Sequence, residues 1–208
     1  MRVRAGARDL HGNAPDSSPV VLLVIDAIND FMFEEGWQVL ADARPIAERI
    51  RRLKRRTRRA GIPTVYVNDN FGRWRSDFRA LIAHCLRPAA RGRSVTRLLQ
   101  PDRLDYFVLK PKHSAFYSTT LELLLEHFRA RALILTGLLA DSCILSTALD
   151  AYMRGYELVV PADCVAARTP EDRRRALALM RRTLQTDTTP SGALDLNVVL
   201  HRSGRKGR

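Results

Sequence analysis

Short apolar runs alternate with longer amphipathic stretches along most of the chain. The run from Val20 to Ile25 contains no polar residue, which is typical of a strand buried on both faces of a sheet. Similar runs recur farther along, and most are followed by a stretch with helical spacing of its apolar residues. This alternation predicts an α/β fold, a parallel sheet with helices packed on its faces. The predicted strands are residues 20–25, 62–67, 105–109, 132–136 and 157–160, with a weak sixth strand within 185–198.

The stretches between the strands carry helical periodicity and capping signals. Residues 42–60 place Ile46, Ile50 and Leu53 on one face and basic residues on the others, and Gly61 suits the end of that helix. The other predicted helices are residues 78–86, a helix of which Ser118 or Thr119 is the cap, residues 143–154 and residues 169–184.

Length and composition fit one domain. A chain of 208 residues with 46% apolar content can form a single substantial core, and we expect the domain to cover residues 19–198. Residues 1–18 mix Arg, Gly, Asp and Pro, so we expect a flexible N-terminal segment. The basic residues 199–208 are expected to form a disordered tail.

The same composition bears on the compartment. The longest uncharged apolar run is far shorter than the roughly 20 residues that a membrane helix needs, and the N-terminal segment has no apolar core of a signal peptide. Cys85, Cys143 and Cys164 are widely spaced and odd in number, which favours reduced thiols. We therefore expect a cytoplasmic protein with no membrane partner.

The net charge of +13 raises the question of a nucleic-acid partner. Much of this charge lies on the outer faces of the helix predicted over 42–60 and in the last eight residues. Neither of these two segments contains Phe, Trp or Tyr among its basic residues, and no nucleic-acid-binding motif accompanies them. A solvated basic face explains the charge, and we do not expect nucleic acid as a partner.

Cys143 stands where an apolar run, Ala132 to Leu135, passes into a new helix. A thiol in the first turn of a helix meets unpaired amides and the positive end of the helix dipole, which lower its pKa and favour the thiolate. The alternative is a small buried residue, because free cysteine is among the most buried residue types. The position alone leaves both interpretations open.

Two further polar residues follow predicted strands. Asp26 ends the segment VVLLVID and Lys110 ends YFVLK, and ligands of open parallel sheets bind at the carboxyl ends of the strands. Lys110 is notable because the chain has 31 Arg and only four Lys. With Cys143 these residues supply a thiol nucleophile, a carboxylate base and a cation, which is a plausible acyl-transfer site.

Three segments in the same order and spacing resemble the isochorismatase-like cysteine hydrolases, which include nicotinamidases, N-carbamoylsarcosine amidase and ureidoacrylate hydrolase. They are VLLVIDAINDF, VLKPKHSAFYSTTLELLL and LTGLLADSCILSTALDAYMRGYEL, and the resemblance covers about residues 19–190. It implies a three-layer α/β/α sandwich with a six-stranded, mostly parallel sheet. It also implies a homodimer or homotetramer.

The resemblance further implies roles for individual residues. Asp26, Lys110 and Cys143 would form the catalytic triad. A cis peptide bond would lie between Leu138 and Leu139, and the amides of Leu139 and Cys143 would form an oxyanion hole.

The chain departs from the nicotinamidases at their metal site, which is built around Asp-x-His after the second strand. Here the segment is Asp69-Asn70-Phe71, so a phenylalanine stands where the first histidine would be. Asp69 and His84 alone do not make a credible divalent site, so we expect no metal and no cofactor.

The long segment 68–100 is typical of an excursion over a binding site. Asn29 and Asp30 are predicted to order their own loop or to orient Asp26. Arg73 and Arg75 are predicted to be solvated, with a substrate carboxylate as the alternative ligand. The residues expected to line or border a substrate pocket, with loop packing as the alternative role for the aromatic ones, are Phe31, Trp37, Asp69, Phe71, Trp74, His113, Ser114 and Tyr117.

The leading hypothesis is therefore a cysteine hydrolase that cleaves a C–N bond of a small amide, ureido or carbamoyl compound through a Cys143 thioester. One alternative is isochorismatase activity, the hydrolysis of a vinyl ether, although members with that activity usually lack the cysteine. The other is a catalytically idle scaffold that binds an anionic partner through its basic face.

Overall fold

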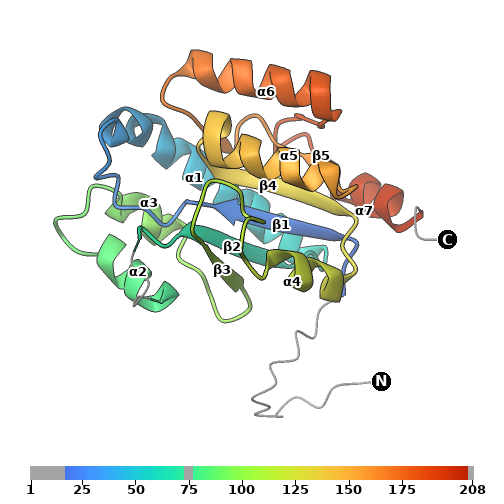
Figure 1. Cartoon of the computed structure of the whole chain (residues 1–208), viewed down its shortest axis with the longest axis horizontal. Coiled ribbons are helices and arrows are strands. Elements are labelled where there is room, and N and C mark those ends of the chain that lie inside the picture. Colours follow the sequence, from blue (N-terminus) through green and yellow to red (C-terminus); the bar gives the residue numbers. More distant parts are fainter. Residues whose placement is uncertain (1–16, 73–76, 206–208) are drawn as a thin grey trace, which may run out of the picture.

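The computed structural model describes residues 17–72 and 77–205, which form one α/β sandwich (Figure 1). Its sheet has six strands in the order β3-β2-β1-β4-β5, with β6 also paired to β4, and every pairing is parallel. The strands are β1 (Val20–Ile25), β2 (Thr64–Asp69), β3 (Tyr106–Lys110), β4 (Ala132–Leu138), β5 (Glu157–Val159) and β6 (Val165–Ala166).

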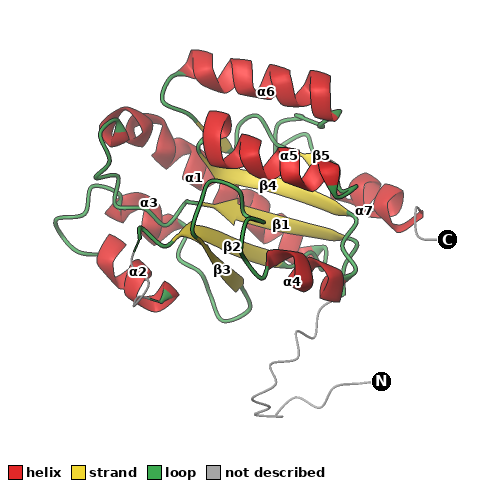
Figure 2. Ribbon diagram, in the orientation of Figure 1, coloured by secondary structure: helices red, strands yellow, loops and turns green. Residues whose placement is uncertain are grey.

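Helices cover both faces of the sheet, so that the strands form the middle of three layers (Figure 2). Alternate residues of β1 point to opposite sides: Leu22 and Val24 join one core, and Leu23 and Ile25 join the other. The first core includes residues of α1 (Gly36–Arg59), α2 (Phe78–Cys85), α3 (Arg93–Leu98) and α7 (Leu196–Arg205). The second includes residues of α4 (Leu121–Phe128), α5 (Leu145–Met153) and α6 (Pro170–Leu184).

Strand order explains where a site can form. From β1 the chain moves outward to β2 and β3, then returns to the other side of β1 with β4 and β5. The reversal lies between β1 and β4, and their carboxyl ends are the topological switch point at which open parallel sheets bind ligands.

Helix α1 begins earlier than its apolar pattern predicts. It starts at Gly36 instead of residue 42, because Val39 and Ala43 extend the buried face upstream of Ile46. Pro45 lies inside the helix on its exposed side.

The predicted sixth strand is wrong. Residues 185–198 contribute to the sheet only an isolated bridge between Asp187 and Val159. The sixth strand, β6, is instead formed by Val165 and Ala166, which pair with Gly137 and Leu138 of β4. Two residues are too few to show a period in the sequence.

The predicted disordered tail is also wrong as far as Arg205. Helix α7 covers this stretch, since Leu196 and Val199 pack into the core and the Ser203 hydroxyl donates a hydrogen bond to the Val199 carbonyl. At the other end, Ser18 is buried and its amide donates to the Phe128 carbonyl, so the flexible segment predicted over 1–18 does not include it. Residues 1–16 lie outside the described part.

Within residues 17–72 and 77–205, no helix is long and apolar enough to cross a membrane.

Candidate active site

Asp26, Lys110 and Cys143 meet at the carboxyl edge of the sheet, although they come from three separate strands. Asp26 follows β1, Lys110 ends β3, and Cys143 lies in the turn after β4. The Lys110 Nζ lies 2.9 Å from Asp26 Oδ2 and 3.5 Å from Cys143 Sγ. The structure therefore brings together the three side chains that the sequence indicated.

Asp26 is held from several sides. Its backbone takes the left-handed conformation, with φ of 49°, and its amide donates to the Val67 carbonyl at 2.8 Å. Its Oδ1 accepts a hydrogen bond from the Asp69 amide at 2.8 Å, and Oδ2 faces Lys110. The carboxylate is thus fixed by β2 and β3, with only 6% of the residue exposed.

Lys110 is completely buried, and its long side chain is needed to span the distance from β3 to Asp26 at the end of β1. Its register partner on β2 is Asp69, so its side chain must pass across the end of β2 to reach Asp26 at the end of β1. Strands in a sheet lie about 4.8 Å apart, which makes the gap two strand spacings. A third contact, 3.1 Å from Nζ to the Lys112 carbonyl, completes the hydrogen bonds of the ammonium.

Cys143 does not lie in the first turn of an α-helix as predicted. It belongs to a π-helical turn, η1 (Ala140–Ile144), which precedes α5 and is closed by the Ile144 amide donating to the Leu139 carbonyl. The peptide bond between Leu138 and Leu139 is cis.

The strand that leads to this turn must approach β1 closely. Gly137 has φ of 117°, and a Cβ built there would lie 1.9 Å from the Ile25 carbonyl oxygen. Only glycine fits at this position. The close approach sets β4 beside the end of β1 and hence Cys143 beside Asp26.

The electrostatics of the three groups differ from the expectation of a thiolate. Burial raises the pKa of Cys143 to about 12, and the adjacent Asp26 carboxylate adds to the rise. Burial also raises the pKa of Asp26 above its ordinary value, against the opposing effect of Lys110. Burial alone would lower the pKa of Lys110, but Asp26, Cys143 and Asp69 together outweigh burial, and the pKa of Lys110 is raised. At neutral pH the thiol is therefore protonated, and the predicted lowering of its pKa is wrong.

His113 is the next polar side chain around the sulfur. Its Nδ1 lies 3.7 Å from Cys143 Sγ and 3.4 Å from the Ser142 hydroxyl, and the residue is exposed. Ser114 faces elsewhere, since its hydroxyl bonds to Asp150. His113 thus borders the solvent side of the site, as predicted. Tyr117 is 58% exposed and makes no direct contact that places it there.

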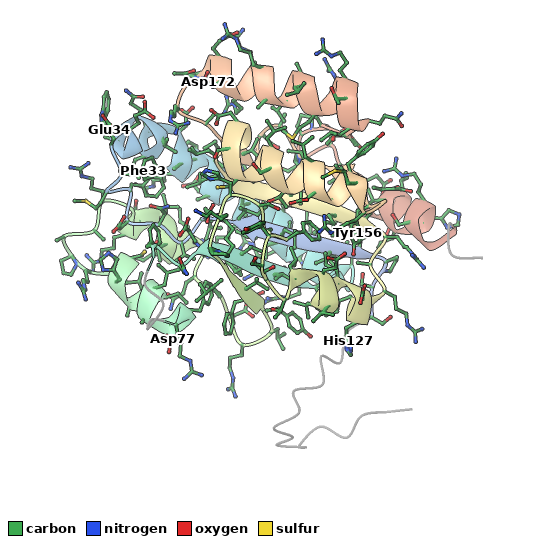
Figure 3. The ribbon with its side chains drawn as sticks, in the orientation of Figure 1. Phe33, Glu34, Asp77, His127, Tyr156 and Asp172 are labelled. Carbon is green, nitrogen blue, oxygen red and sulfur yellow. The ribbon has the colours of Figure 1, made fainter. Side chains whose placement is uncertain are left out.

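A cavity of about 220 Å³ adjoins the site. Asp69 and Phe71 line it, together with Asp77, whose carboxylate caps α2 and which projects at the lower edge of the molecule (Figure 3). Asp69 links this cavity to Asp26 through its backbone amide. Two of the predicted lining residues, Asp69 and Phe71, therefore border a cavity beside the site.

Other predicted lining residues are elsewhere. Phe31 is fully buried and packs in the core, and Trp37 is 63% exposed in the first turn of α1, so neither lines this cavity. Phe31 is drawn into the core by hydrophobic burial. Trp37 lies on the exposed side of α1 because this helix starts earlier than predicted. Trp74, Arg73 and Arg75 lie outside the described residues.

Asn29 and Asp30 order their own loop. Asn29 Oδ1 accepts from the Phe31 amide at 2.7 Å, and Asp30 Oδ1 accepts from the Met32 amide at 3.0 Å. The other oxygen of Asp30 lies 2.7 Å from His84 Nε2. The local interpretation of these side chains is therefore confirmed.

A metal ion does not fit the residues at this position. Asp69 and His84 both line the cavity, but Asp69 Oδ1 is engaged by the Phe71 amide and His84 by Asp30. The described residues contain no group of three or more His, Cys, Asp or Glu side chains that could hold a metal ion. The absence of a metal remains a prediction.

One feature of the site was missed. Arg168, after β6, forms an ion pair with Glu35 and lies 3.4 Å from Asp141 Oδ2 through its Nη1. These residues tie the Cys143 turn to the start of α1. No local pattern could reveal this contact, since its members come from three distant segments.

The fold and site define a class of protein, a doubly wound α/β sandwich with a cysteine at the switch point of its parallel sheet. Residues 20–190 match the family model of the isochorismatase domain. The chain belongs to the isochorismatase family, and it is a hydrolase of that family.

Three similar proteins illustrate the relationship. The uncharacterized isochorismatase family protein YaaI of Bacillus subtilis is 38% identical over 168 residues, which cover 81% of this chain and 92% of that protein. Ureidoacrylate amidohydrolase RutB of Methylorubrum extorquens is 30% identical, with 71% and 70% covered. The crystal structure of N-carbamoylsarcosine amidase from Thermoplasma acidophilum superposes with a TM-score of 0.60 at 27% identity, covering 85% of this chain and 98% of that chain.

Proposed function

We propose that this hydrolase is an amidohydrolase that cleaves a C–N bond of a small amide, ureido or carbamoyl compound. The observation that carries the proposal is the position of the Cys143 thiol beside both Asp26 and Lys110. The similarity to ureidoacrylate amidohydrolase and N-carbamoylsarcosine amidase supports the substrate class.

In this mechanism the thiol loses its proton during attack. Because the pKa of Cys143 is raised to about 12, a free thiolate is too rare at neutral pH to serve as the resting nucleophile. Asp26 has a raised pKa and shares a hydrogen bond with the thiol, so it is placed to accept the proton as the sulfur attacks the carbonyl carbon. Lys110 remains cationic and balances the charge on Asp26.

The tetrahedral intermediate places negative charge on the former carbonyl oxygen. We assign its stabilisation to the backbone amides of Leu139 and Cys143, which belong to the same turn. Collapse of the intermediate breaks the C–N bond, and protonated Asp26 returns its proton to the departing nitrogen. A thioester on Cys143 remains.

Water then hydrolyses the thioester with Asp26 as general base. The water proton passes to Asp26, the hydroxide oxygen bonds to the carbonyl carbon, and the carbon–sulfur bond breaks. The sulfur recovers a proton from Asp26, and the acid product leaves. Each turnover consumes one water and releases one amine or ammonia.

The test combines an ammonia-release screen over small amides and ureido acids with two variants. Cys143→Ala should abolish turnover while the fold is retained, and Cys164→Ala, which also removes one free thiol, should keep turnover. Intact mass after substrate addition should show an adduct on Cys143 alone. Full activity of Cys143→Ala would contradict the thioester mechanism. Release of a carbonyl compound and an alcohol from a vinyl ether, with no ammonia from any amide, would favour the isochorismatase alternative.

A further inference from the structure

A second cavity is lined mainly by arginines, and Asp26, Lys110 and Cys143 are not among its lining residues. It has a volume of about 480 Å³ and lies where α3 packs against α1. We call it the arginine cavity and define it by its six lining residues, Arg44, Arg91, Arg93, Ser94, Arg97 and Leu98. The lining carries four cations and no carboxylate.

The charges of the arginine cavity are poorly compensated. Within residues 17–72 and 77–205 the one ion pair made by these arginines joins Arg44 Nε to Glu48 at 4.0 Å, and both side chains are largely exposed, so this pair contributes little. On α6 the arrangement is different, because Arg174 and Arg175 both pair with Glu171. Proximity of four cations without counter-charges is unfavourable unless an anion occupies the space between them.

Arg93 points to the same conclusion by a separate route. Its Nε is buried, and no acceptor within the described residues bonds to it. A buried N–H without an acceptor costs about 1–3 kcal/mol, so a side-chain shift that brought this Nε to an oxygen of a bound ligand would recover that cost. The planar guanidinium fork matches the oxygens of phosphate especially well.

The start of α3, which carries several of the lining residues, is packed tightly against a neighbouring loop. At Gly92, which precedes α3, a Cβ would lie 1.9 Å from the Asn29 carbonyl oxygen and 2.5 Å from the Phe31 ring. The Gly92 amide also donates to the Asp30 carbonyl at 3.2 Å. The start of α3 is thus packed directly against the loop that follows Asp26, so that the arginines project from a fixed base.

We propose that the arginine cavity binds a small ligand with a chain of two or three phosphates, such as a diphosphate or triphosphate group. The volume lies within the range of small-molecule sites, about 300–1,000 Å³, and exceeds what a single phosphate fills. Four arginines match the charge of such a chain, and the Ser94 hydroxyl adds a neutral donor. The site accounts for part of the positive charge that the hydrolase reaction does not use.

Isothermal titration of the full-length protein with inorganic tripolyphosphate tests the proposal, at about physiological ionic strength so that exposed charges are screened. The site variant is Arg44→Gln with Arg97→Gln, both exposed residues, so the fold is kept. The matched control is Arg174→Gln with Arg175→Gln, which removes the same charge from α6. The site variant should weaken binding at least tenfold, and the control should stay within twofold of the parent protein.

A third variant examines Arg93 itself. Arg93→Lys keeps the charge but removes the Nε and the planar fork, so it should weaken tripolyphosphate binding several-fold. No binding by the parent protein, or equal weakening in the site and control variants, would overturn the proposal. It would also be overturned if a single-stranded oligonucleotide bound to this surface and excess tripolyphosphate failed to displace it.

Discussion

Lys110 and the arginine cavity present cations in opposite circumstances. Lys110 is fully buried, and its ammonium contacts Asp26, the Cys143 sulfur and a backbone carbonyl. Three of the four arginines, Arg44, Arg91 and Arg97, are exposed, and within the described residues the cavity's charge is offset only by the weak pair of Arg44 with Glu48. A buried cation is satisfied by the protein itself and fixes the protonation of its neighbours, whereas a surface group of cations leaves its charge available to a ligand.

The largest expected effect comes from removing the base beside Lys110. Asp26→Asn retains the hydrogen-bonding shape but cannot accept the thiol proton, so kcat should fall about 10³-fold, within the usual 10²–10⁴ contribution of a general base. Steady-state kinetics on the substrate found by the ammonia screen measures this. An Asp26→Asn variant with parental kcat would exclude Asp26 as the base.

The next largest effect is on the free energy of unfolding, which should depend on whether the cation removed is buried or exposed. Lys110→Met leaves the Asp26 carboxylate buried and unpaired, and its free energy of unfolding should fall by about 3–5 kcal/mol. Arg97→Met removes an exposed cation and should change this free energy by about 0.5 kcal/mol or less. Urea denaturation of both variants provides the comparison. Similar losses in the two variants would mean that Lys110 is not held by its ion pair as described.

The smallest effect concerns the thiol. Since the pKa of Cys143 is raised to about 12, its alkylation by iodoacetamide at pH 7 should be slower than that of a free cysteine. The rate should rise about tenfold per pH unit up to pH 10, because the thiolate fraction grows in that proportion well below the pKa. A rate that levels off near pH 8 would show that the pKa is not raised.

The raised pKa of this thiol also makes the free energy of unfolding depend on pH. The direction of this dependence follows from which state, folded or unfolded, binds the thiol proton more tightly. Above about pH 9 the unfolded chain loses the thiol proton while the folded protein retains it until about pH 12. The contribution of Cys143 to folding is therefore fully present below pH 9 and is lost as the pH rises through this window. The Cys143→Ala variant should lose less stability between pH 9 and pH 11 than the parent protein does.

The meeting of Asp26, Lys110 and Cys143 could be predicted because it depends on local features. Each residue directly follows or ends a buried apolar run, and parallel strands bring such positions to one edge. The same reasoning placed most strands and the helices that follow them.

Other features depended on contacts that no local pattern records. The loop position of Phe31 leaves a pocket and loop packing equally open, and only the contact with Gly92 from a distant segment decides that its ring is buried. The raised pKa of Cys143 arises from burial and from Asp26, which oppose the helix-terminus effect on which the expectation of a thiolate rested. Helix α7 forms because Leu196 and Val199 find space in the core, although the residues that follow are basic and polar.

The path of Lys110 across β2 has a consequence for how this protein fails under stress. Strand β3 is at the edge of the sheet, and Phe107 within it is 58% exposed. Slippage of β3 along β2 by two residues would carry the ammonium roughly 6.6 Å away from Asp26, at about 3.3 Å per residue. Fraying of this single edge would silence the site while the rest of the sheet stayed intact, so loss of activity should precede loss of the circular dichroism signal during gradual heating.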